Sequence, residues 1–158
     1  MRPPRPLPPP PAPAPTEPSM SHAETLESYM LRMELPHEKV SDDTWVVGPE
    51  SHSGIRIVVR IDEPIVLYSS PIFAVTERTP DHLGLFRRLL EFNDTTLHCA
   101  YALDGDQILL TGAHQLADLD FSEFQAMVED MAMALDGHLE QLTPWRPAPN
   151  HSDIQEGN

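Results

Sequence analysis

The sequence predicts an α+β domain in which one antiparallel sheet packs against helices, with the elements in the order α-β-β-β-α-β-β-α. Three observations lead to this prediction. Apolar residues alternate with other residues in 55–62 and again in 97–103, which is the two-residue period of strands. Apolar residues also recur at steps of three and four in three longer stretches, which is the period of helices. The prolines crowd at the two ends and leave a long middle segment able to fold.

The proline distribution divides the chain into three parts. Of the 18 prolines, ten lie in residues 1–19 and three follow residue 142. We predict that residues 1–19 form a disordered Pro-rich leader, that residues 20–142 form a single α+β domain, and that residues 143–158 form a flexible C-terminal tail. Met20 is an alternative natural start, because MSHAETLESYM reads as the beginning of a domain. Trp145 could fold back onto the domain.

The chain is strongly acidic, with a formal net charge of −15. Such a surface repels phosphate backbones and anionic lipids, so neither nucleic-acid binding nor membrane binding is expected. No apolar run has the length of a membrane span, and the N-terminal region lacks the apolar stretch of a signal peptide. A single cysteine fits a reducing compartment. We therefore expect a cytoplasmic protein.

The first helix is expected to follow Ser21. Ser21 and Glu24 have the S-x-x-E spacing of a capping box, in which two side chains bind the free backbone amides of the helix start. Pro36 is expected to end the helix. The apolar stripe between them contains Leu26, Met30 and Met33.

Three strands are expected next, joined as a meander. The first covers TWVV, residues 44–47. The second covers GIRIVVRID, residues 54–62, with one buried face and one largely exposed face. The third covers IVLYSSPIFAV, residues 65–75, and is interrupted at Pro71. We place Pro71 at an edge or a bulge because proline has no N–H donor.

The second helix is introduced by TPDH. Thr79 is a suitable cap, Pro80 suits the first helical position, and Asp81 complements the positive end of the helix dipole. Asn93 is expected to end the helix, because asparagine tolerates the left-handed conformation. The apolar stripe between these ends contains Leu83, Leu85, Phe86, Leu89, Leu90 and Phe92.

A hairpin and a long helix complete the domain. The strand over residues 97–103 leads into Asp-Gly-Asp, residues 104–106, where Gly105 supplies a positive φ. The last helix is expected to begin at Asp120, with Glu123 completing a capping-box pair. Its apolar stripe contains Phe124, Val128, Met131, Leu135, Leu139 and Leu142.

The sequence contains no motif typical of a catalytic or metal site. Neighbours in a strand point to opposite faces, so His98 and Cys99 are not expected to form a nucleophile–base pair, and Cys99 is interpreted as a small buried residue. PHEKV has no second histidine at the spacing of a zinc helix. Asp104 and Asp106 are assigned to the turn, because the loop of a calcium site is absent. We expect no enzyme activity, no cofactor and no metal.

Three stretches carry a family resemblance: LLEFND closing the second helix, AYALDGDQILLTG as the hairpin, and LADLDFSEFQAMVEDM leading into the last helix. With the element order and the acidic surface, they make residues 22–142 similar to the type III secretion chaperone-like (CesT-like) fold, and within it to the YbjN-type proteins. The resemblance implies a homodimeric, non-catalytic module. Secretion chaperones of this kind hold a client segment extended over apolar grooves. The Pro-rich leader departs from both groups.

The first functional hypothesis is therefore a protein-binding module that forms a homodimer and binds or regulates an unidentified partner protein. Methionines on the last helix could repack against such a partner, although ordinary core packing is the favoured interpretation of them. The leader contains PxxP spacing beside arginines, so a proline-recognition domain is a further candidate partner for residues 1–19. The candidate contact residues are Arg56, Val58, Arg60, Leu85, Phe86, Leu89, Met127 and Met131.

The alternative hypothesis is a small-ligand-binding protein or an enzyme. In that case His98, His114 and Asp118 would converge near the hairpin.

Overall fold

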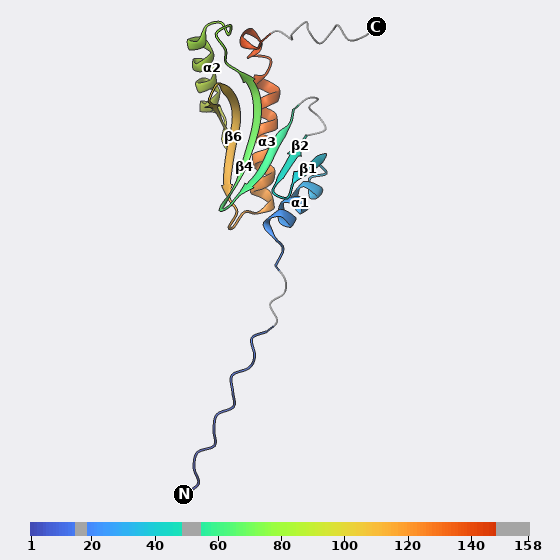
Figure 1. Cartoon of the computed structure of the whole chain (residues 1–158), viewed down its shortest axis with the longest axis vertical. Coiled ribbons are helices and arrows are strands. Elements are labelled where there is room, and N and C mark those ends of the chain that lie inside the picture. The colour runs from blue at the N-terminus through green and yellow to red at the C-terminus, as the bar shows by residue number, and fades with distance from the viewer. Residues whose placement is uncertain (15–18, 49–54, 148–158) are drawn as a thin grey trace.

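The structure, a computed structural model, describes residues 1–14, 19–48 and 55–147. Figure 1 shows its elements, which in chain order are α1 (His22–Arg32), β1 (His37–Ser41), β2 (Thr44–Val47), β3 (Ile57–Asp62), β4 (Ile65–Ala74), α2 (His82–Thr95), β5 (Ala100–Asp104), β6 (Gln107–Gln115), α3 (Phe121–His138) and the 3-10 turn η1 (Thr143–Trp145). The α+β class is confirmed. The observed order, α-β-β-β-β-α-β-β-α, has one strand more than the predicted order.

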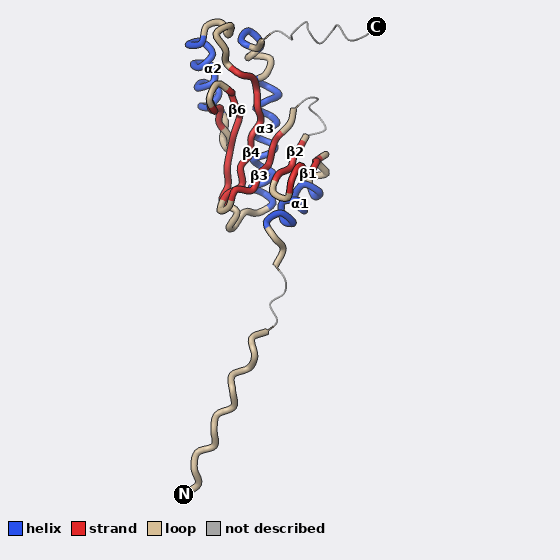
Figure 2. The backbone as a smooth tube through the Cα atoms, in the orientation of Figure 1, coloured by secondary structure: helices blue, strands red, loops and turns tan. Residues whose placement is uncertain are grey.

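Within the described residues, six strands form a single antiparallel sheet in the spatial order β1-β2-β3-β4-β6-β5 (Figure 2). The first four strands form a meander. β5 and β6 form the predicted hairpin, and β6 pairs with β4 along nearly its whole length. The two edges of the sheet are therefore β1 and β5.

The core lies on one face of the sheet. Ile57 and Val59 of β3 are buried, whereas Val58 between them is only half-buried on the opposite face. α3 packs on the buried face, where the ring of Phe124 lies 5.9 Å from the ring of Tyr68 of β4. None of the described helices lies in front of the central strands in Figure 1, so the second face is not covered by them. The other two helices reach the core through Leu26, Met30, Leu85, Leu89 and Phe92.

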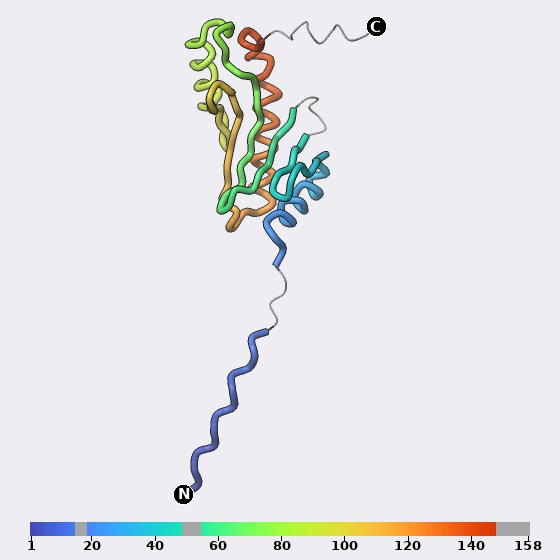
Figure 3. Tube along the Cα trace, viewed as in Figure 1, coloured from blue at the N-terminus to red at the C-terminus, as the bar shows by residue number. Residues whose placement is uncertain are grey.

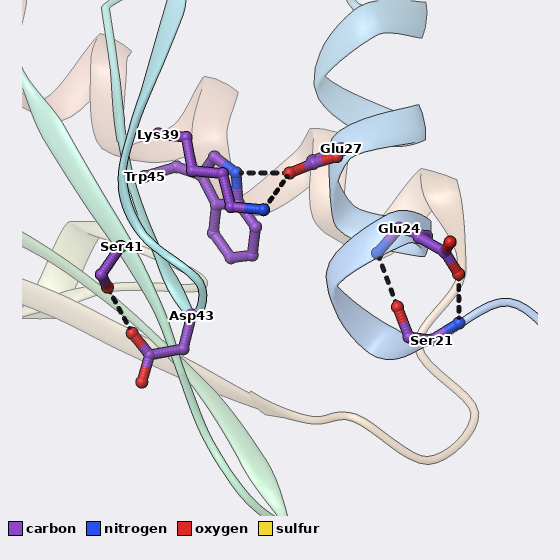
Figure 4. Close-up of polar contacts among 7 residues, drawn as sticks. All are labelled: Ser21, Glu24, Glu27, Lys39, Ser41, Asp43 and Trp45. Carbon is purple, nitrogen blue, oxygen red and sulfur yellow. Dashed lines mark hydrogen bonds and ion pairs between the residues drawn. The ribbon is translucent and has the colours of Figure 1, made fainter.

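The predicted start of α1 is confirmed. The hydroxyl of Ser21 accepts the N–H of Glu24 at 3.2 Å, and the carboxylate of Glu24 accepts the N–H of Ser21 at 2.8 Å (Figure 4). The predicted end is wrong, because the helix stops at Arg32, before Pro36. Glu34 takes a positive φ of 56° there, and the chain turns into β1.

One carboxylate ties α1 to the first hairpin. Glu27 accepts the indole N–H of Trp45 at 3.1 Å and forms an ion pair with Lys39 at 3.0 Å (Figure 4). Trp45 is fully buried, so this bond gives its indole N–H a partner that it would otherwise lack in the core.

β1 was absent from the prediction because it has no alternating pattern. Only His37 of its five residues is half-buried, and the others are exposed. The strand exists through its ladder with β2, which is irregular between Lys39 and Ser41. Backbone pairing, rather than burial of side chains, holds this edge.

The third predicted strand continues through Pro71 without interruption, as β4. Pro71 lies next to a register irregularity in the pairing with β6. The ladder with β3 reaches no farther than Ser69, so the missing N–H of Pro71 costs that ladder no bond.

The predicted start and stop of α2 are wrong. Its N-cap is Asp81, which takes a left-handed φ of 43° and accepts the N–H of Gly84 at 3.1 Å. Thr79 instead accepts the N–H of Thr76 at 2.9 Å within the preceding turn. At the other end the helix runs through Asn93 to Thr95.

The predicted hairpin and the start of α3 are confirmed. Gly105 has a φ of 58° in the turn between β5 and β6. Asp120 accepts the N–H of Glu123 at 2.8 Å, and the carboxylate of Glu123 accepts the N–H of Asp120 at 3.2 Å. α3 then packs closely on β6, since a Cβ added to Gly112 would lie 2.6 Å from the sulfur of Met127.

Parts of both predicted tails are described. Residues 1–14 run extended with exposed side chains (Figure 3). Within the predicted C-terminal tail, η1 forms and Trp145 is half-buried against the core. Residues 15–18 of the leader and 148–158 of the tail lie outside the described residues.

Candidate functional site

α2 is apolar on two faces. Leu85, Leu89 and Phe92 are buried in the core. Leu83 is 81% exposed and Leu90 is 70% exposed, with the half-buried Phe86 between them in sequence. Residues spaced by three and four lie on the same side of a helix, so Leu83, Phe86 and Leu90 form one continuous surface. We call these three residues the α2 surface.

An open groove of about 560 Å³ follows the α2 surface. Charged side chains border it, and among them Glu91 pairs with Arg87 and with Arg88, each at 3.5 Å. A contiguous exposed apolar patch with a polar rim is typical of a protein–protein contact. The groove is lined by Leu83, Phe86, Arg87, Leu90, Glu91 and Asp94.

A second cavity of about 300 Å³ lies where the end of β4, the start of α2 and the β5–β6 hairpin meet. Its lining includes the acidic residues Glu77 and Asp106, the aromatic residues His82 and Phe86, and Leu103. His82 is held in place by a hydrogen bond between its Nε2 and the backbone oxygen of Thr76 at 3.1 Å. Phe86 borders both hollows, so they are adjacent.

The uncovered face of the sheet carries Val58 and Arg60 of the predicted contact residues, and Arg56 directly precedes β3. Arg56 and Arg60 are exposed, and Val58 lies half-buried between its ladder partners Val46 and Ser69. Arg60 forms a long ion pair with Asp62, at 3.7 Å. These three side chains are accessible to a partner.

Of the five other apolar candidates, all except Phe86 are core residues. Their exposed fractions are at most 6%, so they cannot contact a partner in this conformation, which corrects the prediction. The cause lies in the helices themselves: on an element with apolar residues on more than one side, spacing alone does not identify the side that is buried. The residues concerned are Leu85, Leu89, Met127 and Met131.

A cysteine, a histidine and a carboxylate meet before β5. Asp130 of α3 accepts the backbone N–H of His98 at 2.8 Å and the thiol of Cys99 at 3.5 Å, both through Oδ2. The imidazole Nδ1 of His98 lies 3.6 Å from the same oxygen. The prediction that His98 and Cys99 point to opposite strand faces is wrong, because the strand begins only at Ala100.

This arrangement does not activate the thiol. Burial, and then the negative charge of Asp130, raise the pKa of Cys99 to about 12. A nucleophilic cysteine needs a lowered pKa, supplied by a positive charge or a helix N-terminus. The three residues therefore hold the start of β5 against α3, as a structural contact.

The residues of the alternative hypothesis have separate surroundings. Nδ1 of His114 is hydrogen-bonded to the hydroxyl of Tyr68 at 3.1 Å, and burial is the main cause that lowers the pKa of His114. Asp118 takes a φ of 68° before α3. Among the described residues, no hydrogen bond or ion pair joins His98, His114 and Asp118 to one another. In the same part of the chain, no group of three or more histidine, cysteine or acidic side chains could hold a metal ion.

Sequence reasoning missed two polar contacts beside β5. The ring of His138 stacks on Phe92, with centroids 3.8 Å apart, and its Nδ1 lies 3.0 Å from the hydroxyl of Tyr101. Asn93, which was assigned to a helix stop, instead binds the backbone of Tyr101. The only signal in the sequence was that His138 and Asn93 are polar residues at helical spacing from apolar ones. This spacing does not identify Tyr101 as their hydrogen-bond partner.

None of the described helices has the length and apolarity needed to cross a membrane.

Comparison with known families shows which family the chain belongs to. The family model CesT_Tir_1 matches residues 19–146. The chain belongs to the CesT_Tir_1 family of type III secretion chaperones. No curated protein matches the sequence of this CesT_Tir_1 protein.

Solved structures share the fold of this CesT_Tir_1 protein. A structure of the heterodimeric ExoU–SpcU complex from the type III secretion system of Pseudomonas aeruginosa matches with a TM-score of 0.59 and 17% identity, over 78% of this chain and 99% of that chain. YbjN from E. coli, described as a transcription regulator, matches with a TM-score of 0.53 and 13% identity, over 75% and 90%. The Yersinia pestis secretion chaperone SycH, in complex with a YscM2 fragment, matches with a TM-score of 0.52 and 13% identity, over 73% and 98%.

Proposed function

We propose that this protein is a non-catalytic, chaperone-like module of the cytoplasm that binds or regulates a partner protein as a homodimer. Family membership supports the partner-binding role, and structural neighbours include chaperones in complex with other proteins. The observation that carries the proposal is the exposure of Leu83 and Leu90 beside Phe86. Burial of one leucine side chain stabilises by about 1.5–3 kcal/mol, so a protein contact here would gain substantially.

Self-association is assigned to the α2 surface. In a two-fold dimer each copy presents the same patch, so the patch must be complementary to itself. The α2 surface meets this condition, because apolar side chains lie along its centre and both signs of charge lie on its rim. An antiparallel pair of α2 helices centred on this surface would bring Leu83 of one copy toward Leu90 of the other.

Sedimentation velocity on the full chain tests this assignment. We expect wild-type protein to sediment as a dimer at concentrations of tens of micromolar, and the double variant L83D/L90D to sediment as a monomer. The matched control is L31D, because Leu31 of α1 is also 67% exposed but lies on another helix. A monomeric wild type, or equal dissociation in L31D and L83D/L90D, would contradict the homodimer.

Partner binding is assigned to the uncovered face of the sheet. Arg56 and Arg60 flank Val58 there, and the strands on both sides of β3 supply half-buried Val46 and Leu67. A partner segment with apolar residues between acidic ones would complement this face.

A photoreactive phenylalanine at Val58 tests the partner face in the native host. We expect one defined cross-linked protein, and loss of that product when Arg56 and Arg60 are both changed to Glu. The same probe at exposed Met133 of α3 is the control. An identical product from both positions would exclude the sheet face as the contact.

A further inference from the structure

The cavity of about 300 Å³ has the chemistry of a site for an arginine side chain. Two acidic residues, Glu77 and Asp106, line it together with the aromatic residues His82 and Phe86. The two ring centroids are 6.2 Å apart and the rings are tilted to each other. A guanidinium group pairs with carboxylates and stacks on aromatic faces, and the volume is at the lower end of ligand pockets, enough for one or two side chains.

The leader supplies a ligand of that chemistry. Its sequence RPPRPLPPPP places Arg2 and Arg5 three residues apart. A polyproline II helix repeats every three residues, so both arginines lie along one edge of it, about 9 Å apart. Pro-rich segments bind grooves lined by aromatic side chains. Residues 1–14 are extended and their side chains are exposed, so they are available for such a contact.

Charge and length both allow the leader to reach the cavity. The chain carries a formal net charge of −15, whereas Arg2 and Arg5 are the only charged residues in 1–14. Their attraction to an acidic domain is long-ranged at low ionic strength. The leader joins α1 at the end of the sheet away from α2 (Figure 1). β4 spans about 33 Å, and the number of residues from Arg5 to Ser21 allows a reach of about 50 Å.

We propose that the leader of this chain docks in this cavity, with an arginine between Glu77 and Asp106 and the following prolines against the ring of Phe86. The docked arrangement is in exchange with the extended one. Phe86 lines the cavity and also belongs to the α2 surface, so a docked leader and a second copy of the chain would compete for this ring.

A spin label on the leader of the full chain tests the proposal. The variant P9C accepts a nitroxide selectively, because Cys99 is buried and its pKa is raised. We expect the backbone amide signals of His82, Leu103 and Asp106 to lose intensity. The loss should diminish at high salt, which screens the charges.

Two further variants in the P9C background identify the contact. R2E/R5E reverses the ligand charge, and E77Q/D106N removes the charge of the cavity; each should restore the lost intensity. The matched control is E38Q/D62N, which neutralises two exposed carboxylates on β1 and β3 and should leave the loss unchanged. The proposal would be overturned if the amide signals lost intensity uniformly over the domain, lost it at residues away from the cavity, or still lost it in R2E/R5E. The leader would then be free for a separate proline-recognition domain.

Discussion

The side-chain amide of Asn93 pairs with the backbone of Tyr101 as a neighbouring strand would. The N–H of Tyr101 donates to Oδ1 of Asn93 at 2.7 Å, and Nδ2 of Asn93 donates to the carbonyl of Tyr101 at 3.2 Å. Tyr101 lies in β5, the last strand of the sheet, so both of these groups would otherwise have no strand to bind. A single residue of α2 thus closes part of this edge.

We expect N93A to lower the free energy of unfolding by about 1–3 kcal/mol, because the variant leaves two partly buried backbone groups without partners. Urea unfolding measures the loss, and hydrogen exchange at the Tyr101 amide should accelerate. The control D94A changes the exposed neighbour of Asn93 and should unfold as wild type does. Unchanged exchange at Tyr101 in N93A would show that the amide pair does not protect the edge.

The effect of G84A on the free energy of unfolding should change its sign when Asp81 is replaced by alanine. A side chain at Gly84 would overlap the carboxylate that caps α2, so G84A should destabilise the wild-type protein by about 1 kcal/mol, the usual cost of a lost cap. In a D81A background the overlap is gone, and alanine is the better helix former by about 1 kcal/mol. G84A should then be neutral or stabilising. A double-mutant cycle by urea unfolding checks this, and equal effects of G84A in both backgrounds would contradict the overlap.

Cys99 should be inert in the folded protein. A rise of its pKa from the usual 9.0 to about 12 lowers the thiolate fraction about a thousandfold at neutral pH. Reaction with a colorimetric disulfide reagent should therefore be very slow in buffer and fast in urea. D130N, which removes the second cause of the shift, should react faster than wild type when folded. Rapid labelling of native wild-type protein would argue against a buried, protonated thiol.

His138 should contribute to loss of stability in mild acid. Burial lowers its pKa in the folded protein below the usual value of 6.5, so the unfolded chain binds the proton more readily. Its contribution is therefore complete above about pH 6.5 and is lost as pH falls toward the folded pKa. H138F keeps a ring against Phe92 and cannot titrate.

Urea midpoints measured at about pH 7.5 and about pH 5.5, the range in which histidine titrates, check this effect. H138F should show a smaller difference between the two midpoints than wild type. It should also be less stable at the higher pH, because its hydrogen bond with Tyr101 is lost. H22Q changes an exposed histidine and should retain the wild-type difference. An undiminished difference in H138F would exclude this residue as the cause.

Short-range sequence patterns predicted the elements that are stabilised by contacts between residues close in the sequence. The two capping boxes at Ser21 and Asp120, the strand around Ile57 and the turn at Gly105 follow from short-range spacing, and the structure confirms them. β1 could not be predicted in this way, because its exposed side chains carry no period and its pairing with β2 is a backbone property.

The surfaces were harder to predict than the elements. The stripe of α2 was recognised, but its residues divide between two faces, and only the packed structure shows that Leu85 is buried while Leu83 is exposed. Asn93 and Asp130 bind groups that lie 8 and 31 or 32 positions away. Such contacts depend on how the helices are placed around β5, which spacing in one helix does not encode.

The unequal edges of the sheet limit how copies of this molecule can join. Asn93 occupies backbone groups of β5, and Thr96 donates its hydroxyl to the carbonyl of Cys99 at 2.6 Å, next to that strand. Within the described ranges, β1 pairs with β2 on one side and with no strand on the other. Fibril growth needs two usable edges on every unit. Two molecules joined β1 to β1 would leave only β5 as a described free edge, and Asn93 already occupies part of it. Further edge-to-edge addition would therefore be disfavoured.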